Sequence, residues 1–423
     1  MKLVIIGAGF GGLRLARKLN NKIGFQITLL DRYNYHQFQP LFYQVATAGL
    51  DASSISFPLR KVFHESKNVR FCMAEVKEIL HYENKVLTDI GEFVYDKLII
   101  ATGADTNFFG NEMLQANAMP MKSSVEAIEL RHRLLKNFED ASTTIDLKEL
   151  QRLMTIVVVG GGATGVELSG AIADMRRFVL PKDYPELDFS IMKIILLEGS
   201  PKLLPSMSEK SSKQSKAYLE TLGVTVQTNT VVKNYDGKTT TLQDGSTIET
   251  ALLIWAAGVK GNVVAGIDAT AIARGNRIKV NNQCLVNAFE NVYAIGDIAF
   301  MDSDILFPNG HPQVAPVAIQ QADLIANNFI NEDNKKRLHT FVYNDKGSMA
   351  TIGRKLAVVD VPKPKIHFGG FLAWLVWMFL HLMLIVGVKN RLSVFFNWFY
   401  SYFTKDQNLR LIFKVNYKER KKD

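Results

Sequence analysis

The 423-residue sequence predicts an α/β fold with two Rossmann-like dinucleotide-binding domains and a C-terminal amphipathic helical region. Three observations lead to this prediction. A pattern of strand, glycine turn, helix and strand opens the chain, and the same pattern returns in its middle. The last part of the chain combines many aromatic side chains with basic ones.

The first pattern covers residues 2–31. A short β-branched strand leads into Gly7, Gly9 and Gly12, which fit the spacing Gly-x-Gly-x-x-Gly at the start of a helix. In this motif the glycines allow a tight turn, a close approach of backbone to a pyrophosphate, and close packing of helix on strand. The second strand ends at Asp31, where a carboxylate can accept hydrogen bonds from ribose hydroxyls. An ordinary tight turn is the alternative, but strand, helix and terminal acid together favour a nucleotide site.

The second pattern begins with a predicted strand at residues 155–159. Gly160, Gly162 and Gly165 repeat the fingerprint, and Glu198 ends the second strand. The acid follows at a long spacing, which makes its assignment weaker than that of Asp31. No arginine lies next to Glu198, so a 2′-phosphate would meet an unpaired negative charge and NADH is favoured over NADPH. Lys202 leaves the opposite preference open.

Two fingerprints in one chain suggest two dinucleotides that exchange a hydride. Predicted strands at residues 95–100 and 252–256 run into Thr102, Gly103 and Gly258, small residues that let backbone approach a cofactor. Asp297 follows another strand, where it could bind a ribityl hydroxyl or, alternatively, cap a helix.

Composition limits the remaining chemistry. Cys72 and Cys284 form no Cys-x-x-Cys pair and are too few for an iron–sulfur site, so redox chemistry must come from a bound cofactor. The eight histidines show no metal-ligand spacing, and we predict no metal site. His36 is expected to be an ordinary hydrogen-bonded histidine.

Several motifs together resemble the flavoprotein type II (non-proton-pumping) NADH:quinone oxidoreductases. These motifs are GAGFGG at 7–12, YHQFQPLFYQVATAGL at 35–50, ATGA at 101–104, GGGATGVEL at 160–168, WAAGVKG at 255–261 and YAIGD at 293–297. The resemblance covers nearly the whole chain and implies oxidation of NADH through FAD with reduction of a membrane quinone.

The resemblance also implies roles for individual residues. FAD is expected to bind at Gly7, Gly9, Gly12, Asp31, Thr102, Gly103 and Asp297. NADH is expected to bind at Gly160, Gly162, Gly165 and Glu198, with Gly258 and Ala315 also near a cofactor. Glu167 is expected near the nicotinamide and Gln320 at the quinone pocket, and these two are the expected catalytic residues.

Two positions depart from the family's motifs. Ala171 replaces a second glutamate, and Pro316 replaces the first glutamine of the quinone-side motif that here reads Ala315 to Gln320. Gln320 could instead simply open a helix with Gln321.

The positive charge of the chain lies mostly in its tail. Residues 365–423 hold 10 Lys and Arg against 3 Asp and Glu, which accounts for most of the net charge of +9. They also hold 14 of the 43 aromatic residues, a mixture that suits an anionic membrane surface better than nucleic acid. We therefore expect residues 365–423 to bind a membrane and expect no nucleic-acid partner.

The tail could span the membrane or lie on it. Residues 371–388 carry no charge, and as a helix they would be about 27 Å long, against a hydrocarbon core of about 30 Å. A span would place the basic terminus opposite the nucleotide domains, against the positive-inside tendency. Between residues 391 and 404 a polar stripe (Ser393, Asn397, Ser401 and Thr404) runs along one side of an otherwise apolar helix, which favours interfacial attachment.

The expected organisation follows from these parts. We expect an FAD-binding domain at 1–120 and 266–364, an NADH-binding domain at 121–265 and an anchoring region at 365–423. No signal peptide is evident, so we expect the enzyme on the cytoplasmic face of the cell membrane, as a homodimer. The alternatives are that the tail helices form a dimer interface or core, that the enzyme is a sulfide:quinone reductase, or that the chain is a non-catalytic flavin-containing signalling or assembly protein.

Overall fold

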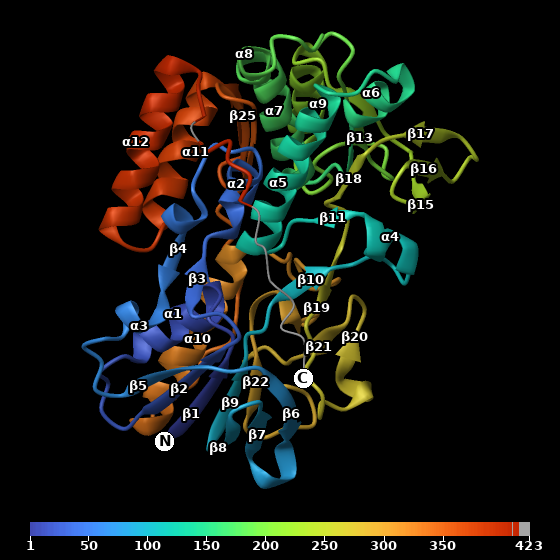
Figure 1. Ribbon diagram of the computed structural model, residues 1–423. Coiled ribbons are helices and arrows are strands. Elements are labelled where there is room, and N and C mark those ends of the chain that lie inside the picture. Colours follow the sequence, from blue (N-terminus) through green and yellow to red (C-terminus); the bar gives the residue numbers. More distant parts are fainter. Residues whose placement is uncertain (408, 414–423) are drawn as a thin grey trace, which may run out of the picture. The chain divides into compact units, whose positions relative to one another are not determined.

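The computed structural model describes residues 1–407 and 409–413, which divide into two compact units (Figure 1). Unit 1 consists of Met1–Gln37, Ser56–Asn107 and Val259–Asp345. Unit 2 consists of Phe38–Ile55, Phe108–Gly258 and the chain from Lys346 onward. The chain therefore passes several times between the units, and neither unit is a continuous stretch of sequence.

Unit 1 is built on a five-stranded parallel sheet in the order β22-β9-β1-β2-β5. Its strands are β1 (Lys2–Ile6), β2 (Gln26–Asp31), β5 (Val69–Met73), β9 (Lys97–Ile100) and β22 (Val292–Ala294). Because both faces of a parallel sheet are covered, these strands are rich in buried Leu, Ile and Val. Helices α1 (Phe10–Leu19) and α10 (Ala315–Asp333) pack on each other.

The rest of unit 1 consists of short helices and strands. They are β3 (Tyr35–Gln37), β4 (Ser56–Pro58), α3 (Leu59–Val62), β6 (Val76–Leu80), β7 (Lys85–Thr88), β8 (Gly91–Val94), β10 (Ala104–Thr106), β19 (Val259–Gly261), β20 (Ile272–Ala273), β21 (Arg277–Lys279) and β23 (Ala299–Phe300).

Unit 2 repeats the same sheet order with different strands, β11-β18-β12-β13-β14. These are β11 (Met119–Pro120), β12 (Thr155–Val159), β13 (Lys193–Leu197), β14 (Thr225–Gln227) and β18 (Leu252–Trp255). In each sheet the strand that precedes the glycine turn lies in the middle. The middle strand is the point at which connections in a doubly wound sheet change direction, and ligands bind at its carboxyl end.

The helices and remaining strands of unit 2 surround that sheet. They are α2 (Phe42–Ala46), α4 (Glu112–Asn117), α5 (Ser124–Ala141), α6 (Leu147–Leu153), α7 (Ala163–Phe178), α8 (Leu180–Asp183), α9 (Glu209–Thr221), β15 (Val232–Tyr235), β16 (Thr239–Leu242), β17 (Thr247–Glu249), β24 (Ser348–Ile352), β25 (Leu356–Val361), β26 (Ile366–Gly370), α11 (Phe371–Leu384) and α12 (Val388–Thr404).

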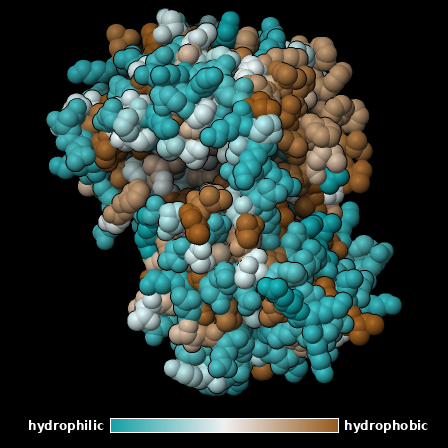
Figure 2. Space-filling model, turned by 180° about the vertical axis from the view of Figure 1, so that it is seen from behind, coloured by the Kyte–Doolittle hydropathy of each residue, from teal (hydrophilic) through white to brown (hydrophobic). Residues whose placement is uncertain are grey.

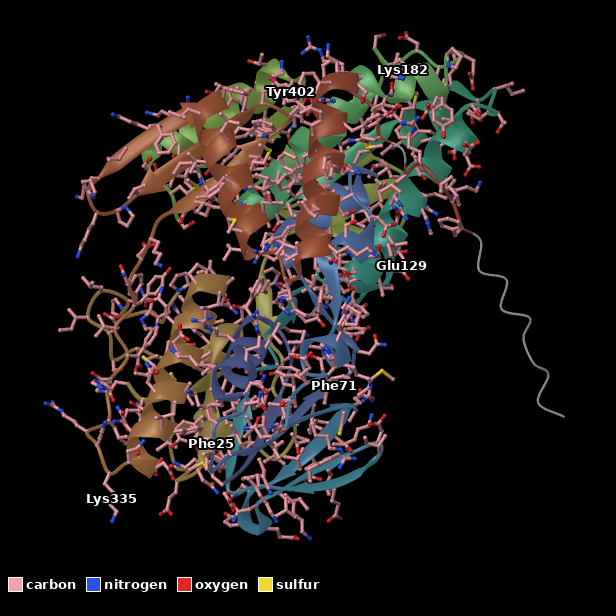
Figure 3. The ribbon with its side chains drawn as sticks, turned by 90° about the vertical axis from the view of Figure 1, so that its left-hand side faces the viewer. Phe25, Phe71, Glu129, Lys182, Lys335 and Tyr402 are labelled. Carbon is pink, nitrogen blue, oxygen red and sulfur yellow. The ribbon has the colours of Figure 1, made fainter. Side chains whose placement is uncertain are left out.

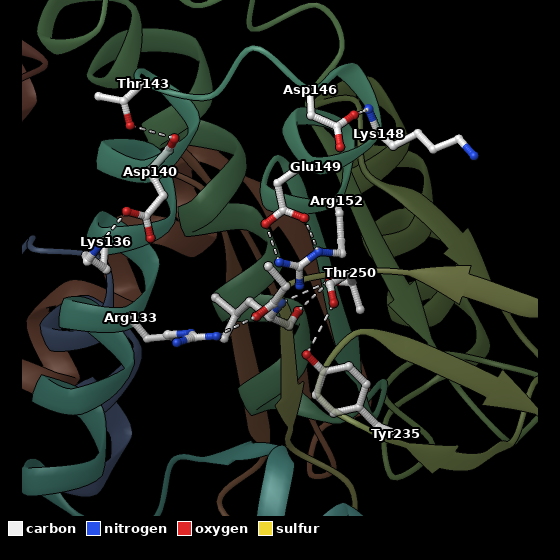
Figure 4. A network of polar contacts seen from close by, with 12 residues as sticks. Arg133, Lys136, Asp140, Thr143, Asp146, Lys148, Glu149, Arg152, Tyr235 and Thr250 are labelled. Atoms are coloured by element: carbon white, nitrogen blue, oxygen red, sulfur yellow. Dashed lines mark hydrogen bonds and ion pairs between the residues drawn. The ribbon is translucent and has the colours of Figure 1, made fainter.

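Polar contacts fix the end of the unit 2 sheet at which β18 begins, opposite the glycine turn (Figure 4). The guanidinium of Arg152 binds both carboxylate oxygens of Glu149, and the backbone carbonyl of Arg152 accepts from the N–H of Ala251. The hydroxyl of Tyr235 donates to the carbonyl of Thr250 at 3.3 Å. These bonds join α6 and β15 to the start of β18.

The tail forms part of the core of unit 2. Helix α11 packs on β25 and β26, and the side chains of Trp377, Ile385 and Val394 are almost fully buried. The prediction of one helix over residues 371–388 is wrong at its end, because the chain leaves the helix after Leu384 and turns at Gly387, where φ is +88°. None of the helices in the described part of the chain has the length and hydrophobicity needed to cross a bilayer.

In α12 the polar residues Ser393, Asn397 and Ser401 contact the protein together with the buried Val394, whereas most of the large apolar side chains face outward. Ser393 hydrogen-bonds to Ser54 at 3.0 Å, and the carbonyl of Ser401 accepts a bond from Arg354. The outward side chains are large and exposed; in α11 and α12 they include Phe371, Leu372, Phe379, Met383, Leu384, Leu392, Phe395, Phe396, Phe399 and Phe403. We call the surface formed by these side chains the outer apolar face. Figure 2 shows it in brown and tan at the upper right. Most of the predicted basic terminus (414–423) lies outside the described residues.

Candidate functional site

The glycine turn of unit 1 has the backbone that the fingerprint predicts. Gly7 has a φ of +99°, and a Cβ on it would lie 2.3 Å from the carbonyl oxygen of Ala101. A Cβ on Gly12 would lie 1.9 Å from the carbonyl oxygen of Gly7. Gly9, in contrast, has no atom within 4 Å of its Cβ position and precedes the first turn of α1. The turn therefore leaves an open space at a helix N-terminus, where phosphate groups bind.

Asp31 closes this turn from the end of β2. One carboxylate oxygen accepts from the N–H of Ala8 at 2.7 Å and the other from the N–H of Tyr33 at 2.8 Å. Burial raises the pKa of Asp31, and these two N–H groups partly oppose that rise. The buried ring of His36 bonds to the carbonyl of Ala8 at 2.9 Å through Nδ1, so His36 is a hydrogen-bonded histidine that supports the turn, as predicted.

The turn of unit 2 has the same construction. Gly160 has a φ of +110°, a Cβ on Gly165 would lie 1.9 Å from the carbonyl oxygen of Gly160, and Gly162 has open space around its Cβ position. Glu198 accepts from the N–H of Gly161 and, at 2.6 Å, from that of Ser200.

Asp31 and Glu198 thus occupy equivalent positions, although the second spacing is longer. The extra residues make α7 longer than α1, 16 residues against 10, and form α8 and the turn after it, outside the sheet. Lys202 donates to the carbonyl of Met207 at 3.3 Å.

Other predicted residues of unit 1 follow the ends of the neighbouring strands β9 and β22. Thr102 donates to the carbonyl of Asn262 at 2.7 Å, and Gly103 has a φ of +68° with open space around its Cβ position. Asp297 lies inside a short 3-10 helix (Gly296–Ile298) and is not its cap, because the N-cap residue is Ile295. The carbonyl of Asp297 accepts from Gln313 at 3.0 Å.

Helix α10 begins at Ala315, so Gln320 lies within its second turn and does not open it. The amide of Gln320 exchanges hydrogen bonds with the backbone of Asn344. Gln321, which the sequence did not single out for a cofactor role, is buried and accepts from the N–H of Gly296 at 2.7 Å. This bond fixes the start of α10 against the strand end that carries Asp297.

Gly258 ends the middle segment of unit 2 and does not face an open space. Its φ is +77°, and a Cβ there would lie 2.6 Å from the ring of Phe109. The positive φ favours glycine here, and a side chain would also displace the ring of Phe109.

Glu167 lies on the first turns of α7 and is buried. Its Oε1 accepts from the N–H of Thr351 at 3.2 Å and from the Thr351 hydroxyl at 3.4 Å. Burial raises the pKa of Glu167 to about 8. The buried indole nitrogen of Trp377 has no hydrogen-bond partner in the described part of the chain, yet the indole lies near enough to lower that pKa slightly.

A chain of hydrogen bonds leads away from Glu167. The hydroxyls of Thr351 and Tyr43 are 3.0 Å apart, the amide of Gln44 donates to the Tyr43 hydroxyl at 2.9 Å, and the indole of Trp398 donates to Gln44 at 2.6 Å. This chain links α7, β24, α2 and α12 inside unit 2. The sequence motif that contains Tyr43 gives no indication of Thr351 and Trp398 as partners, because they lie more than 300 residues away.

Two hollows of unit 2 lie on either side of Tyr43. One, of about 360 Å³ including its part open to solvent, is lined by Gln39, Pro40, Phe42, Tyr43, Met121, Lys122, Thr164 and Glu167. It opens at the first turn of α7, beside the glycine turn. The other, of about 770 Å³ including its part open to solvent, lies under α11 and α12 and includes Ala171, the position that departs from the family motif.

The described residues form neither a cysteine pair nor a cluster of metal ligands. Cys72 lies on the edge strand β5, whereas the carbonyl of Cys284 accepts from Ala294 on β22, the opposite edge strand of the same sheet. Both are free and buried, and they do not form a pair. Among the described residues there is no cluster of His, Cys, Asp or Glu suited to a metal ion.

Comparison with known proteins decides the family. The sequence model of the pyridine nucleotide-disulphide oxidoreductases matches residues 1–322, and that of the NDH2 C-terminal domain matches residues 346–405. The type II NADH:quinone oxidoreductase NdhA of Mycobacterium tuberculosis is 38% identical over 94% of this chain and 86% of its own length. The chain belongs to the type II NADH:quinone oxidoreductases. Membership confirms the predicted family and enzyme class.

Two further similarities agree with this family. The enzyme Ndh of the same organism is 35% identical over 94% of this chain and 87% of its own length. The solved structure of Plasmodium falciparum NDH2 in complex with NADH superposes with a TM-score of 0.88 over 98% of this chain and 99% of that one, at 22% identity. The second similarity supports the predicted fold class.

Proposed function

We propose that this type II NADH:quinone oxidoreductase oxidises NADH through bound FAD and passes the electrons to a membrane quinone. The observation that carries the proposal is the presence of two glycine turns of the same construction, one in each unit, in a chain that belongs to this family. Each turn has an open space at a helix N-terminus and a carboxylate beside it.

The expected FAD residues all belong to unit 1 and the expected NADH residues to unit 2. Ala315, expected near a cofactor, begins α10 in unit 1. When bound, FAD would supply the redox chemistry by accepting a hydride and releasing its electrons to an acceptor. The protein itself would bind FAD and NADH and orient them. The N–H groups at the starts of α1 and α7 face the open spaces, and the carboxylates of Asp31 and Glu198 hold the turns in shape.

Glu167 is the residue we propose to handle a proton. Because its pKa is about 8, its carboxyl carries a proton at neutral pH, and reduction of a quinone to a quinol consumes protons. Its place on the wall of the smaller hollow, beside Thr164, supports the expected position near the nicotinamide. Gln320 stays our candidate for the quinone side, on the strength of its place in the family motif.

The experiment that tests this function uses the full-length flavoprotein. Addition of NADH without oxygen should bleach the flavin absorbance, and a soluble quinone analogue should restore it within the turnover time. No bleaching, or reoxidation slower than turnover, would rule out the proposed activity in favour of a non-catalytic flavoprotein. Addition of sulfide in place of NADH separates the sulfide:quinone alternative, for which we expect no bleaching.

The preference for NADH is proposed to come from Glu198. Glu198→Gln keeps the size of the side chain and one acceptor oxygen but removes the charge that would repel a 2′-phosphate. We expect the kcat/KM ratio of NADH to NADPH to fall about tenfold, equivalent to about 1.4 kcal/mol. A ratio unchanged from the wild type, with flavin content unchanged, would show that Glu198 only supports the turn.

We further propose that the outer apolar face of α11 and α12 attaches the enzyme to the membrane from the cytoplasmic side without crossing it. Exposed apolar patches of this kind mark membrane or protein contacts, and Trp, Phe and Tyr suit the interface of a bilayer. A second copy of the chain is the other occupant that this face fits, in keeping with the expected homodimer.

Phe396→Ser with Phe403→Ser tests the attachment, because both rings are exposed and neither supports the core. We expect the double variant to leave membranes while keeping its flavin and its melting temperature. If it stays on membranes but changes from dimer to monomer in light scattering, the face is a subunit interface.

A further inference from the structure

Four basic side chains gather where α12 ends. The cations of Arg177, Arg354 and Lys405 lie 5.2, 5.7 and 5.2 Å from the centre of one aromatic ring, that of Phe178. The ammonium of Lys355 lies 5.5 Å from the ring of Tyr402, which Figure 3 labels near this end of α12. These four residues, here called the basic cluster, come from the end of α7, the turn between β24 and β25, and the cap of α12.

Few negative charges lie beside the basic cluster. In the described part of the chain, Arg177, Lys355 and Lys405 form no ion pair, and Arg354 donates to the backbone carbonyls of Ser401 and Tyr402. The acid that interacts with Arg354 and Arg177 is Asp174, whose own pKa is raised by burial to about 7, so its charge is only partial at neutral pH.

The other nearby acids are already occupied. Arg410 pairs with Asp183 at 2.5 Å and with Asp406 at 2.6 Å, and Lys182 adds a further positive charge beside both of them. An exposed cation–π contact contributes only about 0.5–1 kcal/mol, and a single ring cannot neutralise three cations. The cluster therefore carries a local excess of positive charge that attracts anions.

The surroundings of the cluster are apolar on two sides. The ring of Tyr402 contacts that of Phe403, which is 66% exposed and continues the outer apolar face toward Phe399. On the other side, Arg354 and Tyr402 also line the larger hollow of unit 2, together with Trp374, Trp377 and Met378. A ligand that fits this place has a negative head and an apolar body.

We propose that the basic cluster binds the phosphate group of an anionic phospholipid in the membrane to which α11 and α12 attach. Arg177, Lys355 and Lys405 contact the phosphate, Arg354 holds the end of α12 in place beside it, and the acyl chains lie along Phe399 and Phe403. This inference rests on the proposed membrane attachment and adds to it a lipid-specific site, formed mainly by residues that precede the tail.

The test compares binding of the full-length flavoprotein to two kinds of vesicle, phosphatidylcholine alone and phosphatidylcholine mixed with phosphatidylglycerol. The cluster variant carries Arg177→Gln, Lys355→Gln and Lys405→Gln. The matched control carries Lys210→Gln, Lys233→Gln and Lys238→Gln, three exposed lysines of unit 2 outside the cluster, so that both variants lose the same charge. Flavin content and bleaching by NADH verify that each variant is folded.

We expect the wild type and the control to prefer the mixed vesicles. The cluster variant should lose that preference by a factor on the order of 100, the size expected when three basic residues leave an anionic surface. It should still bind phosphatidylcholine through the outer apolar face.

An equal loss in the control would show that overall charge, not a site, sets the preference. A preference kept by the cluster variant, or none in the wild type, would overturn the lipid site while the attachment stands. Full displacement by inorganic phosphate would show an anion site with no role for the lipid body. A wild type that binds neither vesicle would instead refute the attachment itself.

Discussion

Gly162 and Gly165 lie three residues apart in α7 and its cap, but their surroundings differ. A Cβ on Gly165 would lie 1.9 Å from a carbonyl oxygen, whereas nothing lies within 4 Å of a Cβ on Gly162. The backbone of Gly162, with a φ of −70°, also accepts an alanine without strain. Gly165 is therefore required by the packing of the protein, whereas no packing contact requires glycine at position 162.

This difference predicts opposite effects of alanine. Gly162→Ala should raise the KM for NADH about tenfold or more, since one methyl group blocks backbone approach to the pyrophosphate, with an unchanged melting temperature. Gly165→Ala should lower the melting temperature by several degrees, because helix and strand must separate. Steady-state kinetics and thermal melts of both variants measure this. A stable Gly162→Ala enzyme with wild-type KM would contradict the proposed NADH site.

Glu167 makes stability depend on pH in a predictable direction. Its folded-state pKa of about 8 is above the ordinary value of 4.5, so the folded chain keeps a proton that the unfolded chain loses. Stability from this group is present at low pH and is lost as the pH rises toward 8, at no more than about 1.4 kcal/mol per pH unit. Asp174, with a pKa of about 7, changes stability in the same direction, but its loss of stability ends at a lower pH.

Glu167→Gln should therefore flatten the fall in unfolding free energy between pH 7 and 8, measured by denaturant titration. Asp174→Asn is the matched control: it should remove part of the fall below pH 7 and leave the fall above it. An identical slope in Glu167→Gln and the wild type would mean that the carboxyl is ionised in the folded protein.

At the scale of elements, α12 shows that an amphipathic pattern does not state which side faces the protein. Val394 is fully buried, whereas Phe396, two residues later, is 62% exposed. We expect Val394→Ala to cost about 2 kcal/mol of unfolding free energy, through lost apolar burial and a cavity. Phe396→Ala should change it by less than about 0.5 kcal/mol. Denaturant unfolding in mild detergent measures both, and an equal cost would mean that α12 packs with its apolar side inward.

Sequence patterns predicted the elements that depend on local signals. The strand at 155–159 and the turn after Gly160 agree with the structure because hydrophobic runs and glycine spacing are local. The end of α11 was missed because a positive φ at Gly387 gives no signal in hydropathy. The bonds among Glu167, Thr351 and Tyr43 could not be predicted, because they depend on how three distant segments pack.

At the scale of the whole molecule, the tail is not a detachable anchor. The expectation that residues 365–423 form an anchoring region was drawn from composition, yet Trp377 and Val394 fill the core of unit 2 and Trp398 completes its hydrogen-bond chain. Unit 1, in contrast, contains no residue after Asp345. The two nucleotide sites should therefore respond differently to loss of the tail.

A chain truncated after Pro364 should keep FAD, because the expected FAD residues all lie in unit 1. It should lose tight binding of NADH as unit 2 loosens. The large apolar side chains removed include Trp377, and loss of a buried aromatic ring alone costs about 3–5 kcal/mol. Flavin absorbance, an NADH titration and limited proteolysis measure the three consequences.

The double variant Phe396→Ser and Phe403→Ser is the control that leaves the membrane with unit 2 intact. If the truncated chain binds NADH as tightly as this control and resists protease equally well, the tail contributes nothing to the core and serves attachment alone.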